Sequence, residues 1–258
     1  MLLEARLEPA LLLKRVVDAM KDLCKDVNFE CSERGIQVQA MDVSHVALVS
    51  LLLREAAFSE FTCDTPMSLG VNVEALAKIL KMCSAGDSLK IRRSEEDVAN
   101  LQIDSGHSDR VTDFDLKLMQ IDSEHMDIPE QHFAATARLP AAEFQRICRD
   151  LRDFGDTMQV SASKMAITFS VRGDLGSGSV LLRPRQGARP EERVDISVKE
   201  PVTATFALRY LVHFARGAPL CSHVELSLGV DAPLLVRYEL ERSANGHLQF
   251  YLAPKVDE

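Results

Sequence analysis

The sequence lacks the features that mark secreted, membrane-anchored and disulfide-bonded proteins. No apolar run approaches the roughly 18 residues that a membrane span needs, and charged side chains such as Glu4, Arg6 and Glu8 interrupt the leucine-rich start. We therefore expect neither a signal peptide nor a membrane anchor. The six cysteines include no Cys-x-x-Cys pair, and no Asn-x-Ser/Thr acceptor occurs. This pattern indicates a reducing compartment in which the thiols are free and mostly packed.

Recognisable catalytic motifs are also missing. There is no P-loop, no His-Glu-x-x-His, no Gly-x-Ser-x-Gly and no paired Cys/His metal spacing. The glycine-rich stretch Gly173–Gly178 lies between strand patterns and opens no helix, which predicts a hairpin rather than a phosphate-binding loop. Asp113, Asp115 and Asp122 are carboxylates that a two-metal nuclease would use, but alternation places the first two on the polar side of a strand. We predict no enzymatic activity, no metal and no cofactor.

Charge is distributed unevenly along the chain. The net charge of −9 should repel nucleic acid and membrane surfaces unless the positive charge is segregated. Four helical patterns together carry +5, which leaves −14 for the rest of the sequence. A solvated helix face explains such a bias on any one helix, so the contrast alone is a modest signal for DNA binding.

The two halves of the chain show the same order of helix and strand patterns. Each half opens with a Leu-Pro element that leads into an amphipathic helix pattern, then shows alternating strand-like runs, a second short helix and more strands. The helix patterns cover about residues 9–25, 73–81, 141–153 and 208–216, and the first strand runs cover Val27–Leu53 and Met158–Leu182. Strands grouped around few helices, without regular alternation, predict an α+β fold in which two similar domains each have antiparallel sheets and two helices.

Each helix pattern has an apolar stripe with basic residues away from it. The stripes are Leu13, Val16, Val17, Met20, Leu23 and Cys24; Leu76, Ile79 and Leu80; Phe144, Ile147, Cys148 and Leu151; and Tyr210, Leu211 and Phe214. The residues off these stripes are Lys14, Lys21 and Lys25; Lys78 and Lys81; Arg146, Arg149 and Arg152; and Arg209, His213 and Arg216.

A join separates the halves. We expect an N-terminal domain at 1–117, a linker at 118–134 and a C-terminal domain at 135–258. The linker interleaves carboxylates with Ile121, Met126 and Ile128-Pro129. Because exposing that much apolar side chain to water is unfavourable, we expect the linker to offer a binding surface as well.

Several blocks closely resemble the eukaryotic DNA sliding clamps, the proliferating cell nuclear antigen family. They are Met41–Leu48, Asp115–Met119, Ile128–Gln131, Phe144–Leu151, Phe206–Leu211 and Gly246–Lys255, and the resemblance runs nearly end to end. It implies a sliding-clamp fold assembled into a closed homotrimeric ring of six domains, with twelve helices lining a hole that duplex DNA threads. It further implies a nuclear protein without catalytic activity that gives DNA polymerases processivity. Clamp loader, nuclease, ligase and other replication and repair clients would dock on it through short peptides.

The resemblance also assigns residues to three surfaces and one modification site. The DNA-facing residues would be Lys14, Arg15, Lys21, Lys78, Lys81, Arg110, Arg146, Arg149 and Arg216. The pocket for client peptides would be Met41, His45, Val46, Leu48, Met126, Ile128, Pro129, Pro233, Tyr251, Leu252, Ala253 and Pro254. The subunit interface would pair a strand at about 110–118 with one at about 175–182, and its apolar contacts would be Phe114, Leu116, Leu151, Phe154 and Val180. Lys164 falls at the family's modified lysine.

Other hypotheses stay open at the level of sequence. A subunit of the heterotrimeric checkpoint clamp belongs to the same class, although the intact Tyr251–Pro254 end and Ile128-Pro129 favour the replicative form. A metal-dependent nuclease that uses the linker carboxylates, and a scaffold that never encircles DNA, belong to different classes.

Overall fold

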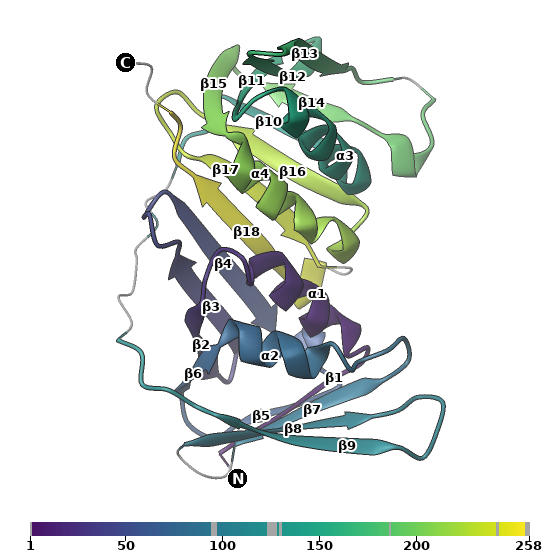
Figure 1. Cartoon of the computed structure of the whole chain (residues 1–258). Coiled ribbons are helices and arrows are strands. Elements are labelled where there is room, and N and C mark those ends of the chain that lie inside the picture. Colours follow the sequence, from purple (N-terminus) through teal and green to yellow (C-terminus); the bar gives the residue numbers. More distant parts are fainter. Residues whose placement is uncertain are drawn as a thin grey trace. The chain divides into compact units, whose positions relative to one another are not determined.

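The computed structural model describes residues 2–93, 97–122, 128, 131–185, 187–240 and 243–255 (Figure 1). The chain divides into two compact units. Unit 1 comprises Met1–Val43, Val49–Met126 and Leu240–Leu248, and unit 2 comprises Ser44–Leu48, Asp127–Glu239 and Gln249–Glu258. Neither unit is one continuous segment of the chain.

Unit 1 contains two antiparallel sheets and two helices. Its elements are β1 (Leu3–Leu7), α1 (Leu11–Met20), β2 (Asp26–Ser32), β3 (Gly35–Met41), β4 (Ala47–Arg54), η1 (Glu55–Ala57), β5 (Glu60–Cys63), β6 (Met67–Asn72), α2 (Val73–Leu80), β7 (Ser88–Arg93), β8 (Val98–Asp104) and β9 (Val111–Lys117). One sheet has the order β5-β1-β7-β8-β9, and the other contains β4-β3-β2-β6. β4 contributes residues to both units, as does β18 (Gly246–Leu252).

The helices α1 and α2 lie side by side in unit 1 (Figure 1). The predicted stripe of α1 is buried, including Leu23 and Cys24, although the helix ends at Met20 rather than near residue 25. The backbone N–H groups of both residues donate to the carbonyl of Met20, so a tight turn keeps them in the core. In α2, the prediction that Ile79 is buried was wrong: it is half-exposed, and Val73 takes the inner position.

Unit 2 repeats this arrangement. Its elements are β10 (Ala135–Pro140), α3 (Ala141–Leu151), η2 (Arg152–Phe154), β11 (Thr157–Ser163), β12 (Ala166–Gly173), β13 (Gly176–Leu182), η3 (Pro190–Glu192), β14 (Asp195–Val198), β15 (Val202–Ala207), α4 (Leu208–Phe214), η4 (Ala215–Leu220), β16 (His223–Leu228) and β17 (Leu234–Glu239). The short turn η5 (Ser243–Asn245), which precedes β18, belongs to unit 1. One sheet has the order β13-β12-β11-β15, and the other contains β14-β10-β16-β17. The two antiparallel sheets and two helices of each unit confirm the predicted α+β fold class.

The core of unit 2 confirms the stripes predicted for its helices. All the residues named for α3 and α4 are buried. The Phe214 and Phe250 rings stack with their centroids 4.7 Å apart, and the hydroxyl of the fully buried Tyr238 donates to the carbonyl of Phe214 at 2.8 Å. The aromatic packing fixes α4, because a buried hydroxyl without a partner would be costly.

The glycine-rich stretch and the cysteines follow the predictions. Gly173–Gly178 is a hairpin between β12 and β13, with Gly176 at φ +139°. All six cysteines are free, and four of them are buried. Within the ranges that the structure describes, no helix is long and apolar enough to cross a membrane.

Candidate nucleic-acid interface and docking surfaces

Apart from Arg110, the predicted DNA-facing residues of unit 1 lie on or beside its two helices. Lys21 forms an ion pair with Asp18 at 2.7 Å, and Lys78 pairs with Glu74 one turn away at 2.9 Å. Lys81, which follows α2, is exposed, and Arg15 is half-buried. Exposed ion pairs of this kind contribute little to stability and exchange readily with other partners. Phosphates can therefore replace these carboxylates as partners of the lysines.

Lys14 is placed differently from the other cations. Its Nζ donates to the carbonyl of Cys83 at 2.8 Å and to that of Lys81 at 3.4 Å. These carbonyls lie at and just beyond the C-terminal end of α2, where the helix dipole favours a cation. Because the ammonium carries three hydrogens and directs two at its own unit, it has limited capacity left for a phosphate.

We predict that Lys14→Met destabilises unit 1 instead of weakening DNA binding. Methionine keeps much of the aliphatic stem but removes the charge-assisted hydrogen bonds, which should lower the free energy of unfolding by about 1–3 kcal/mol. Urea denaturation measures this change. Lys21→Met is the matched control and should change the midpoint little. Equal midpoints for the two variants would contradict a structural role for Lys14.

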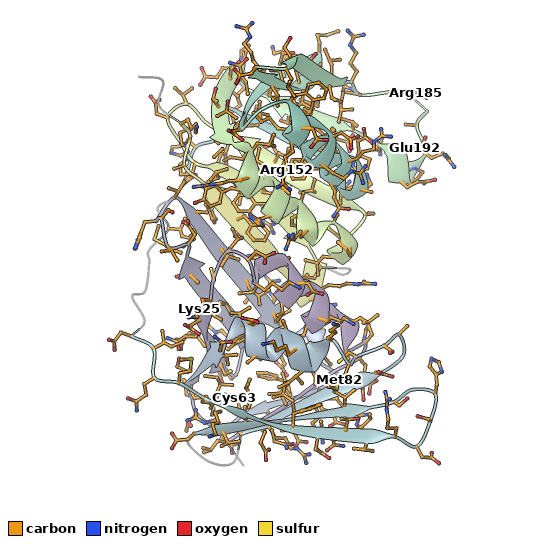
Figure 2. The ribbon with its side chains drawn as sticks, viewed as in Figure 1. Lys25, Cys63, Met82, Arg152, Arg185 and Glu192 are labelled. Carbon is orange, nitrogen blue, oxygen red and sulfur yellow. The ribbon has the colours of Figure 1, made fainter. Side chains whose placement is uncertain are left out.

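In unit 2 the cations of the predicted helix patterns lie on α3, η2 and the segment around α4. Arg146 pairs with Glu143 at 2.8 Å and Arg149 with Asp150 at 3.0 Å, while Arg216 is exposed on η4. The predicted set also omitted Arg152 and Arg209, although both were in the helix patterns. Each is exposed, and Arg152 is labelled in Figure 2.

Arg152 and Arg209 act on a shared neighbour, His213. Burial lowers the pKa of His213, and the positive charges of the two arginines lower it further. The imidazole is therefore neutral at pH 7 and adds no charge to this surface. The guanidinium of Arg209 lies 4.9 Å from the centroid of the Tyr210 ring, a cation–π contact that orients it.

Arg110 lies off the helices, beside the turn between β8 and β9. Its carbonyl accepts a hydrogen bond from the N–H of Ser105 at 3.0 Å, which closes the turn. Its side chain is exposed. The helix faces and this turn therefore present cations that can contact phosphates. Such contacts do not depend on the base sequence.

The strands predicted to form the subunit interface, β9 and β13, are both edge strands that pair with a neighbouring strand on one side only. β9 is the edge of the five-stranded sheet, and β13 is the edge of the four-stranded sheet of unit 2. Phe114 on β9 and Val180 on β13 are half-buried, whereas Leu116 and Leu151 are almost wholly buried within their own units. Phe154 is 43% exposed. Such edges invite pairing with another chain unless something covers them.

The predicted peptide pocket falls mostly within unit 2. In unit 2, residues 44–48 lie against the C-terminal segment: the N–H of Ala253 donates a hydrogen bond to the carbonyl of Val46 at 3.1 Å. The N–H of Lys255 donates to the carbonyl of Thr205 at 2.7 Å, which fixes the segment at its other end. His45 is exposed with φ +54°.

Individual pocket residues differ in how much they offer to a partner. Those with half-buried side chains are Val46, Leu48, Ile128, Pro233, Tyr251 and Pro254. Ala253 is exposed, but the side chain of Leu252 is fully buried, so Leu252 supports the surface from below. Met41 lies in unit 1, and Met126 and Pro129 lie outside the described residues.

Comparison with known proteins gives the family. Residues 2–126 match the family model described as the N-terminal domain of proliferating cell nuclear antigen, and residues 127–255 match that of its C-terminal domain. The chain belongs to the proliferating cell nuclear antigen family. A curated relative, "Proliferating cell nuclear antigen" of Chaetomium thermophilum, is 46% identical over 259 residues, covering 100% of this chain and 99% of that one. The proliferating cell nuclear antigen family comprises DNA sliding clamps, which are non-catalytic scaffolds, and this protein is a sliding clamp.

Lys164, the predicted modification site, occupies an exposed turn. Ser163 pairs with Ala166 across β11 and β12, so Lys164 and Met165 form a two-residue hairpin loop. The Ser163 hydroxyl donates to the carbonyl of Ala166 at 3.3 Å and holds the turn. The ammonium is thus presented to solvent by a rigid hairpin.

Of the carboxylates considered for a nuclease, Asp113, Asp115 and Asp122 do not form a metal site, and Glu124, Asp127 and Glu130 of the linker lie outside the described residues. Asp113 and Asp115 are exposed on β9, as the alternation predicts, and the amide of Asn100 donates to Asp115 at 3.0 Å. Asp122 is also exposed. Among the residues whose positions are described, no group of three His, Cys, Asp or Glu side chains is arranged to hold a metal ion.

Proposed function

We propose that three copies of this chain form a closed ring around duplex DNA in the nucleus and hold polymerases and repair enzymes on it without catalysing a reaction. The observation that carries this proposal is the helix layer of each unit, which buries an apolar stripe and exposes lysines and arginines. Six such layers would form a cationic lining for the ring. Enclosure would retain the DNA, so each phosphate contact can be weak and the ring can slide.

The proposal gives the predicted residues their roles. Lys14 would act mainly on α2, and Arg152 and Arg209 would join the cations that face DNA. The other members of that set are Arg15, Lys21, Lys78, Lys81, Arg110, Arg146, Arg149 and Arg216. Domains at 1–117 and 135–258 would be joined by the linker 118–134, which would cover the client pocket. Lys164 would be the site of modification, and clamp loader, nuclease and ligase would be clients beside the polymerases.

Solution mass tests the ring. Light scattering across a dilution series should give a species near three times 28.6 kDa that persists at low concentration. A monomer at every concentration would contradict the homotrimer and would favour a ring completed by other subunits, as in the checkpoint clamp. A trimer that fails to stimulate a polymerase on circular primed DNA would contradict the processivity role.

We predict that Val46→Ala together with Ile128→Ala weakens client binding about tenfold to a thousandfold. Both side chains are half-buried in unit 2. Truncating a central apolar contact typically costs about 1–2 kcal/mol or more at an interface. The measurement is calorimetric titration with a synthetic peptide that carries one aliphatic and two aromatic anchors.

The control for the pocket is Met165→Ala. Met165 is 74% exposed and lies in the hairpin loop between β11 and β12. Its replacement should leave the dissociation constant unchanged. If the pocket variant binds the peptide as tightly as the control, the client surface is elsewhere.

A further inference from the structure

The segment between β13 and β14 carries a concentration of arginine that the helix layer does not explain. Arg183, Arg185, Arg189 and Arg193 fall within eleven residues, against two glutamates. The segment has a net charge of +2, which leaves −11 for the rest of the chain. All four arginines are exposed. We define the arginine loop as residues 183–185 and 187–193.

The backbone of the arginine loop has a defined conformation. The N–H of Ala188 donates to the carbonyl of Arg185 at 3.4 Å, and Gly187 adopts φ +74°, which glycine tolerates best. The N–H of Glu192 donates to the carbonyl of Arg189 at 2.9 Å and closes the turn of η3. A loop held in this way loses less conformational entropy when it binds a ligand.

A buried histidine of unit 2 lies against the arginine loop. The ring of His223 is buried and lies close to the carbonyls of Pro190 and Arg193. Burial lowers the pKa of His223, and the charge of Arg138 lowers it further, although the two carbonyls oppose the shift. The imidazole is therefore neutral at pH 7 and supports the loop through contact rather than charge.

The four arginines differ in how far carboxylates neutralise them. Arg189 pairs with Glu191 at 3.5 Å and also with Glu192, and Arg193 pairs with Asp195 at 3.4 Å. Arg183 and Arg185 form no ion pair with any residue that the structure describes, although Arg185 contributes to lowering the pKa of Glu192. Figure 2 shows Arg185 and Glu192 on the loop, where the chain extends from unit 2. The uncompensated charge lies at the start of the loop.

The spacing of these two arginines suits a regular polyanion. Pro184 disfavours the helical conformation for Arg183, so the chain continues extended beyond β13. Two residues of extended chain span about 6–7 Å, close to the separation of neighbouring phosphates along a DNA strand. The planar fork of a guanidinium matches a phosphate in shape and charge. A DNA strand repeats this charge at every nucleotide whatever its sequence, whereas a peptide matches the spacing only where acidic side chains recur at every second residue of an extended strand.

We propose that the arginine loop is a second DNA-binding site, in which Arg183 and Arg185 contact consecutive phosphates of DNA that lies outside the helix-lined channel. Arg189 and Arg193 are compensated by carboxylate partners and are assigned no phosphate contact. The site extends the proposed clamp function, since it would engage DNA that the ring has not enclosed. Its binding chemistry requires only the phosphodiester backbone, and therefore no particular sequence.

The test compares salt-dependent DNA binding of the full-length protein and of Arg183→Ser with Arg185→Ser. Fluorescence anisotropy would be measured with a labelled single strand and with the matching duplex. Loss of two phosphate contacts should reduce the slope of log K against log salt by about 1.4 for the single strand and about 1.8 for the duplex. The matched control is Arg34→Ser with Arg54→Ser, which removes two exposed arginines of unit 1.

Each outcome decides the proposal. A reduced slope for one or both DNA forms, absent from the control, supports the site and identifies the form that it binds. An unchanged slope, or an equal reduction in the control, overturns it. Binding of a polyglutamate peptide that the loop variant loses, with DNA binding unchanged, would also overturn it in favour of an acidic protein partner. Because free DNA is the probe, the result does not depend on whether the ring forms or slides, and the variant's solution mass checks assembly separately.

Discussion

Val180→Asp is expected to convert the trimer into a folded monomer. Val180 is half-buried on β13, a strand whose outer edge has no partner within its sheet. A carboxylate there would have to be desolvated when a second chain pairs with the edge, which costs several kcal/mol per ion. A loss of about 4 kcal/mol corresponds to a thousandfold weaker contact. Light scattering measures the mass, and circular dichroism verifies the fold.

Phe114→Asp should have the same effect from the other side of the contact. Phe114 is half-buried on β9, on the opposite face of the strand from Asp113 and Asp115. As at Val180, the new carboxylate would have to be desolvated when a second chain pairs with this edge. The interface therefore fails although β13 remains intact.

Mixing the two variants provides a sharper test of the head-to-tail arrangement. Each variant retains one intact edge, so a mixture can form one β9–β13 contact but cannot close a ring. The expected species has twice the mass of the 28.6 kDa chain. The control Val230→Asp, at a side chain 64% exposed, should remain trimeric. A trimer in either variant, or no dimer in the mixture, would contradict pairing of these two edges.

The sequence predicted best where the hydrophobic pattern was regular. The stripes of α1, α3 and α4 are buried as expected, because a helix that packs on a sheet needs one continuous apolar face. Ile79 was placed wrongly because α2 has only eight residues, and its buried face, made by Val73, Leu76 and Leu80, is centred roughly 90° around the helix from Ile79. A helix this short has too few turns for the spacing of its apolar residues to determine which face is buried.

β5 and β6 fall outside the strand run predicted for the first half, Val27–Leu53, for a related reason. β5 has only four residues, and β6 carries Gly70 where a side chain would have strengthened the pattern. A Cβ on Gly70 would lie 2.0 Å from the carbonyl oxygen of Met119, so the close approach of that segment requires glycine. β1 and β10 run directly into the Leu-Pro elements, which were assigned as helix starts.

The hydrogen-bond and ion-pair partners of individual side chains could not be predicted from the sequence pattern. Lysines at helical spacing predict a basic face, and Lys14 follows that spacing as well as Lys21 does. Only the structure shows that the Lys14 ammonium binds carbonyls beyond α2 whereas Lys21 pairs with Asp18 on the surface. The ion pairs of the arginine loop likewise depend on the turn geometry of η3. Gly187 and Pro190 predict a turn in this segment, but they do not determine which side chains pair.

Simultaneous Lys21→Glu, Lys78→Glu and Arg149→Glu should reduce polymerase stimulation to the level without a clamp. These residues come from α2, α3 and the end of α1, and all three are exposed. In the proposed ring every copy of the chain would place its new carboxylates around the DNA. Each lost phosphate contact lowers the salt slope by about 0.9, and the reversed charges add repulsion. DNA synthesis on primed circular DNA measures the effect.

The same charge change away from the helices separates local from global electrostatics. Arg34→Glu, Arg54→Glu and Lys199→Glu alter the net charge equally, at exposed positions outside α1 to α4. This control should retain most of the stimulation, since at physiological salt the field of an exposed charge is screened within about 8 Å. Equal loss in both triple variants would mean that net charge, rather than the helix faces, governs DNA binding. Because the local carboxylates Asp18, Glu74 and Asp150 already pair with the three cations, the helix variant also turns each neutral pair into two like charges. For this reason three substitutions per chain are expected to exclude DNA from the proposed channel.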